Sequence, residues 1–181
     1  MKLAAMIAMI SFMGAASLAQ EPCNISLNDA PEVFGLKLGM PFEQLQAVLG
    51  KNLKIKPKKT GEGSFFQNFI DQPAPSNLAG VRALFLRFFN NKVYQIEIFY
   101  EDEDKTTKLE DFLSRLSTDL HLPATAWKSK NGRAEMNCGD FLLIADNILN
   151  PHIELTDDAA FTAFKTKKQE EKGSKKKRKQ K

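Results

Sequence analysis

The amino-acid sequence predicts an α+β fold in which helices pack on an antiparallel sheet. Two β-rich runs flank the dipeptide Asn90-Asn91, and a tight turn between such runs implies antiparallel pairing. Apolar residues recur at helical spacing over residues 109–120. Helices alternate with groups of strands rather than with single strands, which favours an α+β layer over a doubly wound parallel sheet. The same order fits a degenerate tandem repeat of one helix-plus-meander unit.

Residues 1–19 have the three-part layout of a secretory signal peptide. Met1-Lys2 is a charged start, residues 3–16 are almost entirely apolar, and Ser17-Leu18-Ala19 offers a cleavage site. The apolar run is shorter than the roughly 20 residues that span a bilayer, and no second apolar span follows it. We therefore expect an exported protein, periplasmic or extracellular, with cleavage near Ala19.

Two cysteines are the next feature of the chain. Cys23 lies in a predicted N-terminal arm, residues 20–33, and Cys138 lies in the last third of the domain. An even number of cysteines in an exported chain favours a disulfide, with two free thiols as the alternative. In the chain-entropy model a bond that closes so long a loop stabilises the fold by about 4–5 kcal/mol.

A single domain is predicted for residues 34–166, and it opens with a helix that begins at Pro41 and stops at Gly50. Pro41 suits the first helical position, and Gly50 is a natural stop. A Lys-rich strand over 51–59 and a turn at 61–63 follow. Another strand over 65–70 and a loop over 71–80 then lead to the central hairpin.

The central hairpin pairs residues 81–89 with 93–100. If its loop has two residues, Phe89 pairs with Lys92 and each strand divides into two faces. The predicted core face comprises Val81, Ala83, Phe85, Ile96, Ile98 and Tyr100. The second face is half apolar, and we predict that it binds a protein partner if it is uncovered: Leu84, Leu86, Phe88, Val93 and Phe99. The alternative is that later strands or the final helix cover it.

The second half of the chain predicts a helix, a hairpin, a strand and a short helix. Thr107 and Glu110 fit a capping box before the helix, and Trp127 is expected in the core. The hairpin is predicted over 133–138 and 141–146, and a last strand over 152–155. Thr156 is expected to cap the final helix, with Phe161 and Phe164 facing inward.

Charge is distributed unevenly along the chain. Residues 165–181 carry ten Lys/Arg and two Glu, whereas residues 1–164 carry 16 basic and 20 acidic side chains. A block of like charge without apolar residues remains disordered, so a disordered Lys-rich tail is predicted for residues 167–181. Its densest part could bind an anionic surface of lipid, glycan or nucleic acid, or serve solubility alone: Lys175, Lys176, Lys177, Arg178 and Lys179.

No motif predicts catalysis, a metal site or a cofactor. The chain has no nucleophile elbow, phosphate loop or paired-histidine metal helix. His121 and His152 are isolated in the sequence, and the acidic run 101–104 lacks the spacing of a calcium loop. An enzyme would need one of these histidines beside a carboxylate in a polar cleft.

The start of the domain has one recognisable pattern, a Gly-Met step into a helix that ends in Leu-Gly. It reads Gly35-Leu36-Lys37-Leu38-Gly39-Met40-Pro41-Phe42-Glu43-Gln44-Leu45 and continues to Val48-Leu49-Gly50. This pattern resembles the start of β-lactamase-inhibitory proteins and of the small outer-membrane assembly lipoproteins of the SmpA/OmlA type. The resemblance implies a helix-on-sheet module that binds other proteins and performs no chemistry. The acylated cysteine of those lipoproteins has no counterpart here, and no individual binding residue can be carried over.

The sequence therefore predicts a non-enzymatic exported protein-interaction module. The alternative is an envelope-surface tether that acts through the basic tail.

Overall fold

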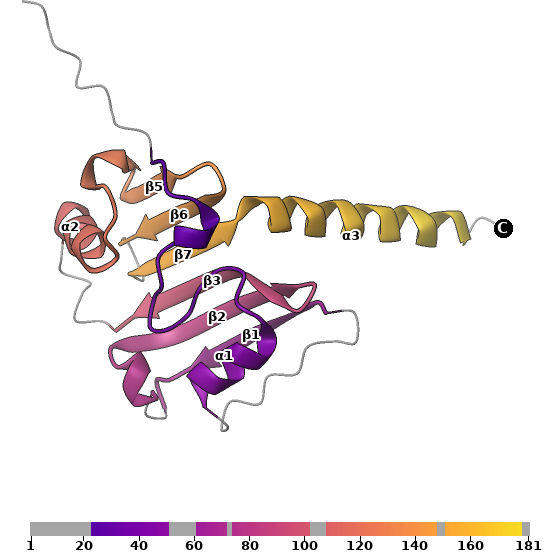
Figure 1. Cartoon of the computed structure of the whole chain (residues 1–181), viewed down its shortest axis with the longest axis horizontal. Helices are drawn as coiled ribbons and strands as arrows, with labels where there is room; N and C mark the ends of the chain where they lie inside the picture. The colour runs from indigo at the N-terminus through magenta and orange to yellow at the C-terminus, as the bar shows by residue number, and fades with distance from the viewer. Residues whose placement is uncertain (1–22, 51–60, 72–73, 102–107, 148–150, 179–181) are drawn as a thin grey trace, which may run out of the picture.

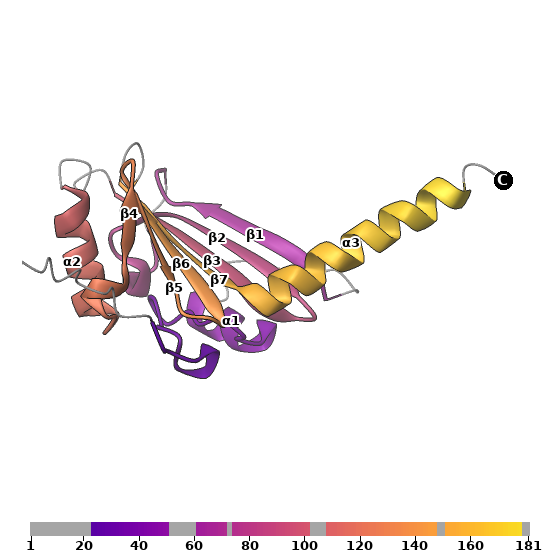
Figure 2. The ribbon, with the colours of Figure 1, turned by 90° about the horizontal axis from the view of Figure 1, so that it is seen from above.

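The computed structural model describes residues 23–50, 61–71, 74–101, 108–147 and 151–178. They form an α+β fold with a single seven-stranded sheet in the order β1-β2-β3-β7-β6-β5-β4. Figure 1 labels the strands from β1 to β5 in this order, and Figure 2 labels β4. Each neighbouring pair of strands is antiparallel. The predicted fold class is confirmed. The signal peptide and the strand predicted over 51–59 lie outside the described residues.

The described strands and helices follow the predicted order, with one further short strand at residues 128–130 that was not predicted. The strands are β1 (Gly63–Asn68), β2 (Val81–Phe89), β3 (Lys92–Tyr100), β4 (Lys128–Lys130), β5 (Arg133–Asn137), β6 (Phe141–Asp146) and β7 (His152–Asp157). The helices are α1 (Phe42–Leu49), α2 (Leu109–Asp119) and α3 (Asp158–Arg178). Within the described ranges, no helix combines the length and hydrophobicity that a membrane crossing requires.

Each half of the sheet is an antiparallel meander that follows a helix. β1, β2 and β3 follow α1, β4 to β7 follow α2, and the two meanders join where β3 pairs with β7. This is the order that a tandem repeat would have, and the duplication itself stays a prediction.

The core lies on one face of the sheet, beneath α1 and α2. Phe42 of α1 contacts Phe88 of β2, with ring centroids 5.9 Å apart. Phe112 of α2 contacts Tyr100 of β3 at 5.7 Å. Figure 2 shows α1 and the N-terminal segment below the sheet. Trp127 is buried in the same core, as predicted, and donates a hydrogen bond to Ser117 at 2.9 Å.

The segment predicted as a separate arm is part of this core from Cys23 onward. Cys23 forms a disulfide with Cys138, as predicted. Ala30 and Val33 are buried in the core cluster, and the amide of Gly39 then donates to the carbonyl of β3 at Val93. The arm therefore crosses the core face from the β5–β6 turn to β3, because its apolar residues are needed to cover the sheet.

The strand register of the central hairpin differs from the one that was used to predict its two faces. Phe89 pairs with Lys92 as expected, and Asn90 and Asn91 both have positive φ angles. However, Arg87 pairs with Gln95, so Tyr94 is an extra residue in β3. Such a bulge moves every later residue of the strand to the opposite face.

The predicted binding face is consequently core. Its first four members are 0%, 0%, 1% and 1% exposed: Leu84, Leu86, Phe88 and Val93. The fifth, Phe99, lies on the opposite face of the sheet, where its ring is 5.0 Å from that of His152. The prediction of an uncovered apolar surface there was wrong, because one register shift joins these leucines to Ile96 and Ile98.

Residues 167–178 of the predicted disordered tail belong to α3, which continues to Arg178, and residues 179–181 lie outside the described residues. Lys, Glu and Gln are good helix formers, and Lys168 pairs with Glu171 one turn later at 3.3 Å. Thr156 belongs to β7, and the side chain that caps α3 is Asp157, whose Oδ1 accepts a bond from the amide of Ala160 at 2.8 Å.

Helix α2 begins one residue later than its predicted capping box requires. Lys108 is its N-cap residue and makes no side-chain cap hydrogen bond, while Thr107 lies outside the described residues.

Candidate functional site

The face of the sheet opposite the core carries a mixture of aromatic and charged side chains, and we call it the open face. Its central row crosses five strands in register: Phe66, Phe85, Glu97, Glu154 and Ile144. Phe66 on the edge strand is 60% exposed. α1 and α2 cannot cover this face because they pack on the other one.

Two carboxyl groups stand opposite each other at the centre of the open face. Glu97 of β3 is the register partner of Glu154 of β7. Burial raises the pKa of Glu97, and the Glu154 carboxylate raises it further. Gln95 and Thr156 donate to Oε1 of Glu154 at 2.7 and 3.0 Å. Like charges directly opposite in a sheet are destabilising, so this pair favours a bound cation or a shared proton.

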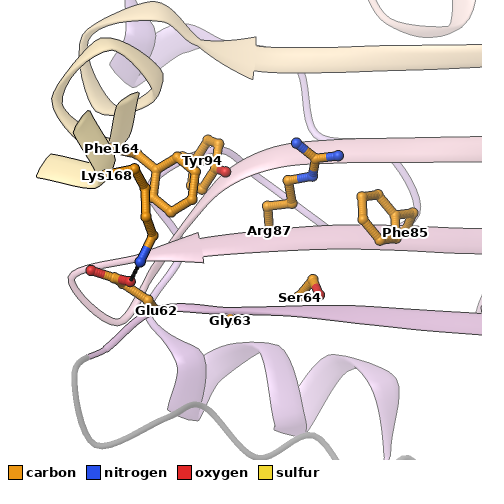
Figure 3. A pocket seen from close by; sticks show the side chains of 8 residues that line it. All are labelled: Glu62, Gly63, Ser64, Phe85, Arg87, Tyr94, Phe164 and Lys168. Atoms are coloured by element: carbon orange, nitrogen blue, oxygen red, sulfur yellow. Dashed lines mark hydrogen bonds and ion pairs between the residues drawn. The ribbon is translucent and has the colours of Figure 1, made fainter. Parts of the chain in front are cut away.

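A cleft of about 380 Å³ lies where α3 meets the open face. Figure 3 shows its side chains, which come from three strands, one helix and the segment before β1. The lining residues are Glu62, Gly63, Ser64, Phe85, Arg87, Tyr94, Phe164 and Lys168. This cleft combines polar donors with aromatic walls.

Arg87 is held in place by two aromatic residues. Its guanidinium carbon lies 5.0 Å from the centroid of the Phe85 ring, and its positive charge acts on the hydroxyl of Tyr94. Burial raises the pKa of Tyr94, and the positive charge of Arg87 counteracts part of that rise. Tyr94 is the bulge residue of β3, so the bulge is what directs this hydroxyl toward Arg87.

The N-terminal half of α3 is fastened to the sheet by an ionic clamp. Glu62, whose side chain is 7% exposed, pairs with Lys167 at 2.5 Å and with Lys168 at 2.6 Å. The ammonium of Lys167, followed by that of Lys168, lowers the pKa of Glu62. Gly61 positions Glu62, because its carbonyl accepts the amide of Asn91 at 2.9 Å and a Cβ there would lie 2.8 Å from that amide nitrogen.

Aromatic stacking supports the clamp. Phe161 and Phe164 of α3 lie over Tyr94, with ring centroids 6.3 and 5.5 Å away, and Phe164 also contacts Phe89 at 6.0 Å. The prediction that Phe161 and Phe164 face inward is confirmed, and they pack on the open face of the sheet.

The remaining candidates from the sequence are scattered. Lys175 to Arg178 belong to the distal end of α3, which projects away from the sheet in Figures 1 and 2, and Lys179 lies outside the described residues. His121 follows α2, whereas His152 lies on the open face beside Phe99. Neither histidine lines the cleft. Among the described residues, no three metal-ligating side chains gather into a possible metal site.

Sequence reasoning missed Glu62, Arg87 and Tyr94 as site residues. Single charged or aromatic residues in predicted strands carry no signal of which neighbours the fold gives them. The inward-facing Phe161 and Phe164 were the one available sign that the final helix covers part of a sheet face.

Comparisons with known proteins do not place this fold in a family. No family model matches the chain, and neither the curated proteins nor the solved structures contain a match. The resemblance at residues 35–50 therefore stays a prediction.

Proposed function

We propose that this protein is a non-enzymatic, exported interaction module that binds a partner protein through the open face of its sheet. The observation that carries the proposal is the central row of that face. It presents an aromatic side chain at the edge strand and two facing carboxyl groups at the centre. Exposed apolar area beside charge is typical of protein-binding surfaces.

The charges of the open face specify the partner's chemistry. Glu97 and Glu154 repel each other, and a Lys or Arg side chain from a partner would relieve that repulsion while it pairs with both. Phe66 would supply the apolar anchor, since interface energy concentrates in a few aromatic and charged residues. The partner surface is therefore basic at its centre and apolar toward β1.

Two exposed apolar residues give a matched test of the open face. Phe66 lies on the open face within β1, whereas Ile70, which is 65% exposed, lies beyond the end of that strand. The mature, disulfide-bonded protein would be crosslinked to native envelope fractions as wild type, Phe66→Ser and Ile70→Ser. We expect Phe66→Ser to lose at least about tenfold in capture of the partner, and Ile70→Ser to keep it. Equal capture by all three proteins would refute the open face as the binding surface.

The basic helix favours a second candidate function, an envelope-surface tether. α3 has 21 residues and extends beyond the sheet, so its distal lysines are carried on a helical arm. Each basic residue near an anionic membrane contributes about 1 kcal/mol of attraction.

A truncation that keeps the clamp tests the tether. Deleting residues 172–181 leaves Lys167 and Lys168 on Glu62. A tether should then lose its salt-sensitive binding to anionic vesicles while its melting temperature stays unchanged. Unchanged binding to these vesicles would exclude a lipid tether through this segment.

A further inference from the structure

We propose that the cleft beneath α3 binds the C-terminal carboxylate of a polypeptide whose last side chain is apolar. This inference rests on the proposed function, since it names the part of a partner protein that the open face would receive. Phe85 and Arg87 belong to both the cleft and the open face, so a chain that ends in the cleft can continue across the sheet.

The first argument is the hydrogen-bonding capacity of Arg87. A guanidinium has five N–H donors arranged as a planar fork that matches a carboxylate. Arg87 lies over Phe85 and lines the cleft together with Tyr94, and within the described parts of the chain no carboxylate forms an ion pair with it. Its N–H donors are therefore available to a ligand.

The second argument is the charge balance of the cleft. The ammonium of Lys168 is engaged by Glu62 at 2.6 Å and by Glu171 at 3.3 Å. Among the described residues, Arg87 has no ion-pair partner, and its charge lowers the pKa of Glu97 without a direct contact. Of the charged side chains that line the cleft, Arg87 is thus the cation that no carboxylate of the described chain contacts directly.

The third argument is the shape and lining of the cleft. Phe85, Tyr94 and Phe164 form aromatic walls, and Ser64 offers a hydroxyl donor across from Arg87 (Figure 3). A volume of about 380 Å³ lies at the lower end of the range for small-ligand sites. Such a cleft suits one terminal residue with its carboxylate and its apolar side chain.

Two dipeptides that differ only at the C-terminus test the contribution of the carboxylate to binding. N-acetyl-Leu-Phe with a free C-terminus and the same dipeptide as its carboxamide would be titrated into the full mature protein and followed by calorimetry. We expect the acid to bind about ten- to a hundredfold more tightly than the amide, as expected for a charge-assisted hydrogen bond. Equal affinities, or no binding of either compound, would overturn the inference.

Variants then assign the preference to Arg87. Arg87→Gln should reduce the affinity for the acid to that for the amide, whereas Arg82→Gln on the same strand, outside the cleft, should leave the preference intact. Arg87→Lys keeps the charge but loses the planar fork, so it should lower the preference even if Arg87→Gln fails to fold. A preference that survives both Arg87 variants would refute the assignment.

Two further comparisons separate a carboxylate site from a phosphate site, and the cleft inference from the open-face function. Phenyl phosphate that binds more tightly than the dipeptide acid would replace the carboxylate assignment with a phosphate site. If partner capture depends on Phe66 but the dipeptide acid and amide bind alike, the open-face function stands and the cleft inference fails. If the dipeptide acid binds more tightly than the amide but partner capture does not depend on Phe66, the cleft inference stands and the open-face function fails.

Discussion

Replacing Glu62 with glutamine should loosen the C-terminal helix while leaving the sheet folded. The variant removes the one carboxylate that both Lys167 and Lys168 contact, and it keeps the size of the side chain. The two lysine side chains are 39% and 37% exposed, so solvent screens both contacts. Removing the charge of Glu62 should therefore cost about 0.5–2 kcal/mol in the free energy that holds α3 on the sheet.

Amide hydrogen exchange measures this effect locally. A loss of 0.5–2 kcal/mol corresponds to about two- to thirtyfold faster exchange in the docked part of α3, with β1 and β2 unchanged. Glu170→Gln is the matched control, because Glu170 is exposed on the same helix and its variant makes the same change of charge. At about 1 M salt, where the screening length is roughly 3 Å, the difference should shrink.

The pH dependence follows from the lowered pKa of Glu62. A carboxyl whose pKa is depressed by folding stabilises the fold above its unfolded value of 4.5 and loses that contribution as the pH falls through the folded value. The exchange rates of α3 in the wild type and in Glu62→Gln should therefore become equal in strong acid. If α3 of the Glu62→Gln variant exchanged its amide hydrogens at the wild-type rate at neutral pH, the clamp would be refuted. The same would follow if exchange in β1 and β2 accelerated as much as exchange in α3.

Three further perturbations test other parts of the structure. Glu97→Gln should raise stability at pH 7 by about 0.2–1 kcal/mol by relieving repulsion from Glu154. Because burial and Glu154 raise the pKa of Glu97 above its unfolded value of 4.5, this gain should shrink as the pH falls through the folded value and vanish below the unfolded one. A constant gain in melting curves from pH 4 to 8 would contradict it. Joint replacement of Cys23 and Cys138 by serine should cost about 2–5 kcal/mol in urea unfolding, and an unchanged midpoint would exclude a stabilising disulfide. Phe164→Ala should accelerate amide hydrogen exchange in α3, as Glu62→Gln does. If α3 of the Phe164→Ala variant exchanged at the wild-type rate, the stacking of Phe164 on the sheet would not hold the helix.

The elements whose signals lie within a few residues were predictable. Asn90 and Asn91 tolerate positive φ angles, and both adopt them in the turn between β2 and β3. Gly50 ends α1 with a φ of 79°, as its lack of a Cβ allows. Cys23 and Cys138 could pair only with each other within one chain.

The errors arose where one residue changes the environment of many. Tyr94 is an ordinary strand residue by composition, yet its place in the bulge moves Leu84 and Leu86 into the core. The Lys-rich segment after residue 166 has no apolar residue to bury, yet Glu62 gives it a partner more than a hundred positions earlier in the chain.

The sequence by itself determined the class of fold, the turns, the periods of the helices and the single disulfide pairing, because these follow from local backbone preferences and from the number of cysteines. Only the tertiary structure decided which face of the sheet is open. It also decided that Arg87 lies among aromatic side chains with no ion-pair partner from the described segments, and that α3 is clamped beside it. Such features depend on strand register and on contacts between distant segments, and a shift of one residue in a strand exchanges core and surface.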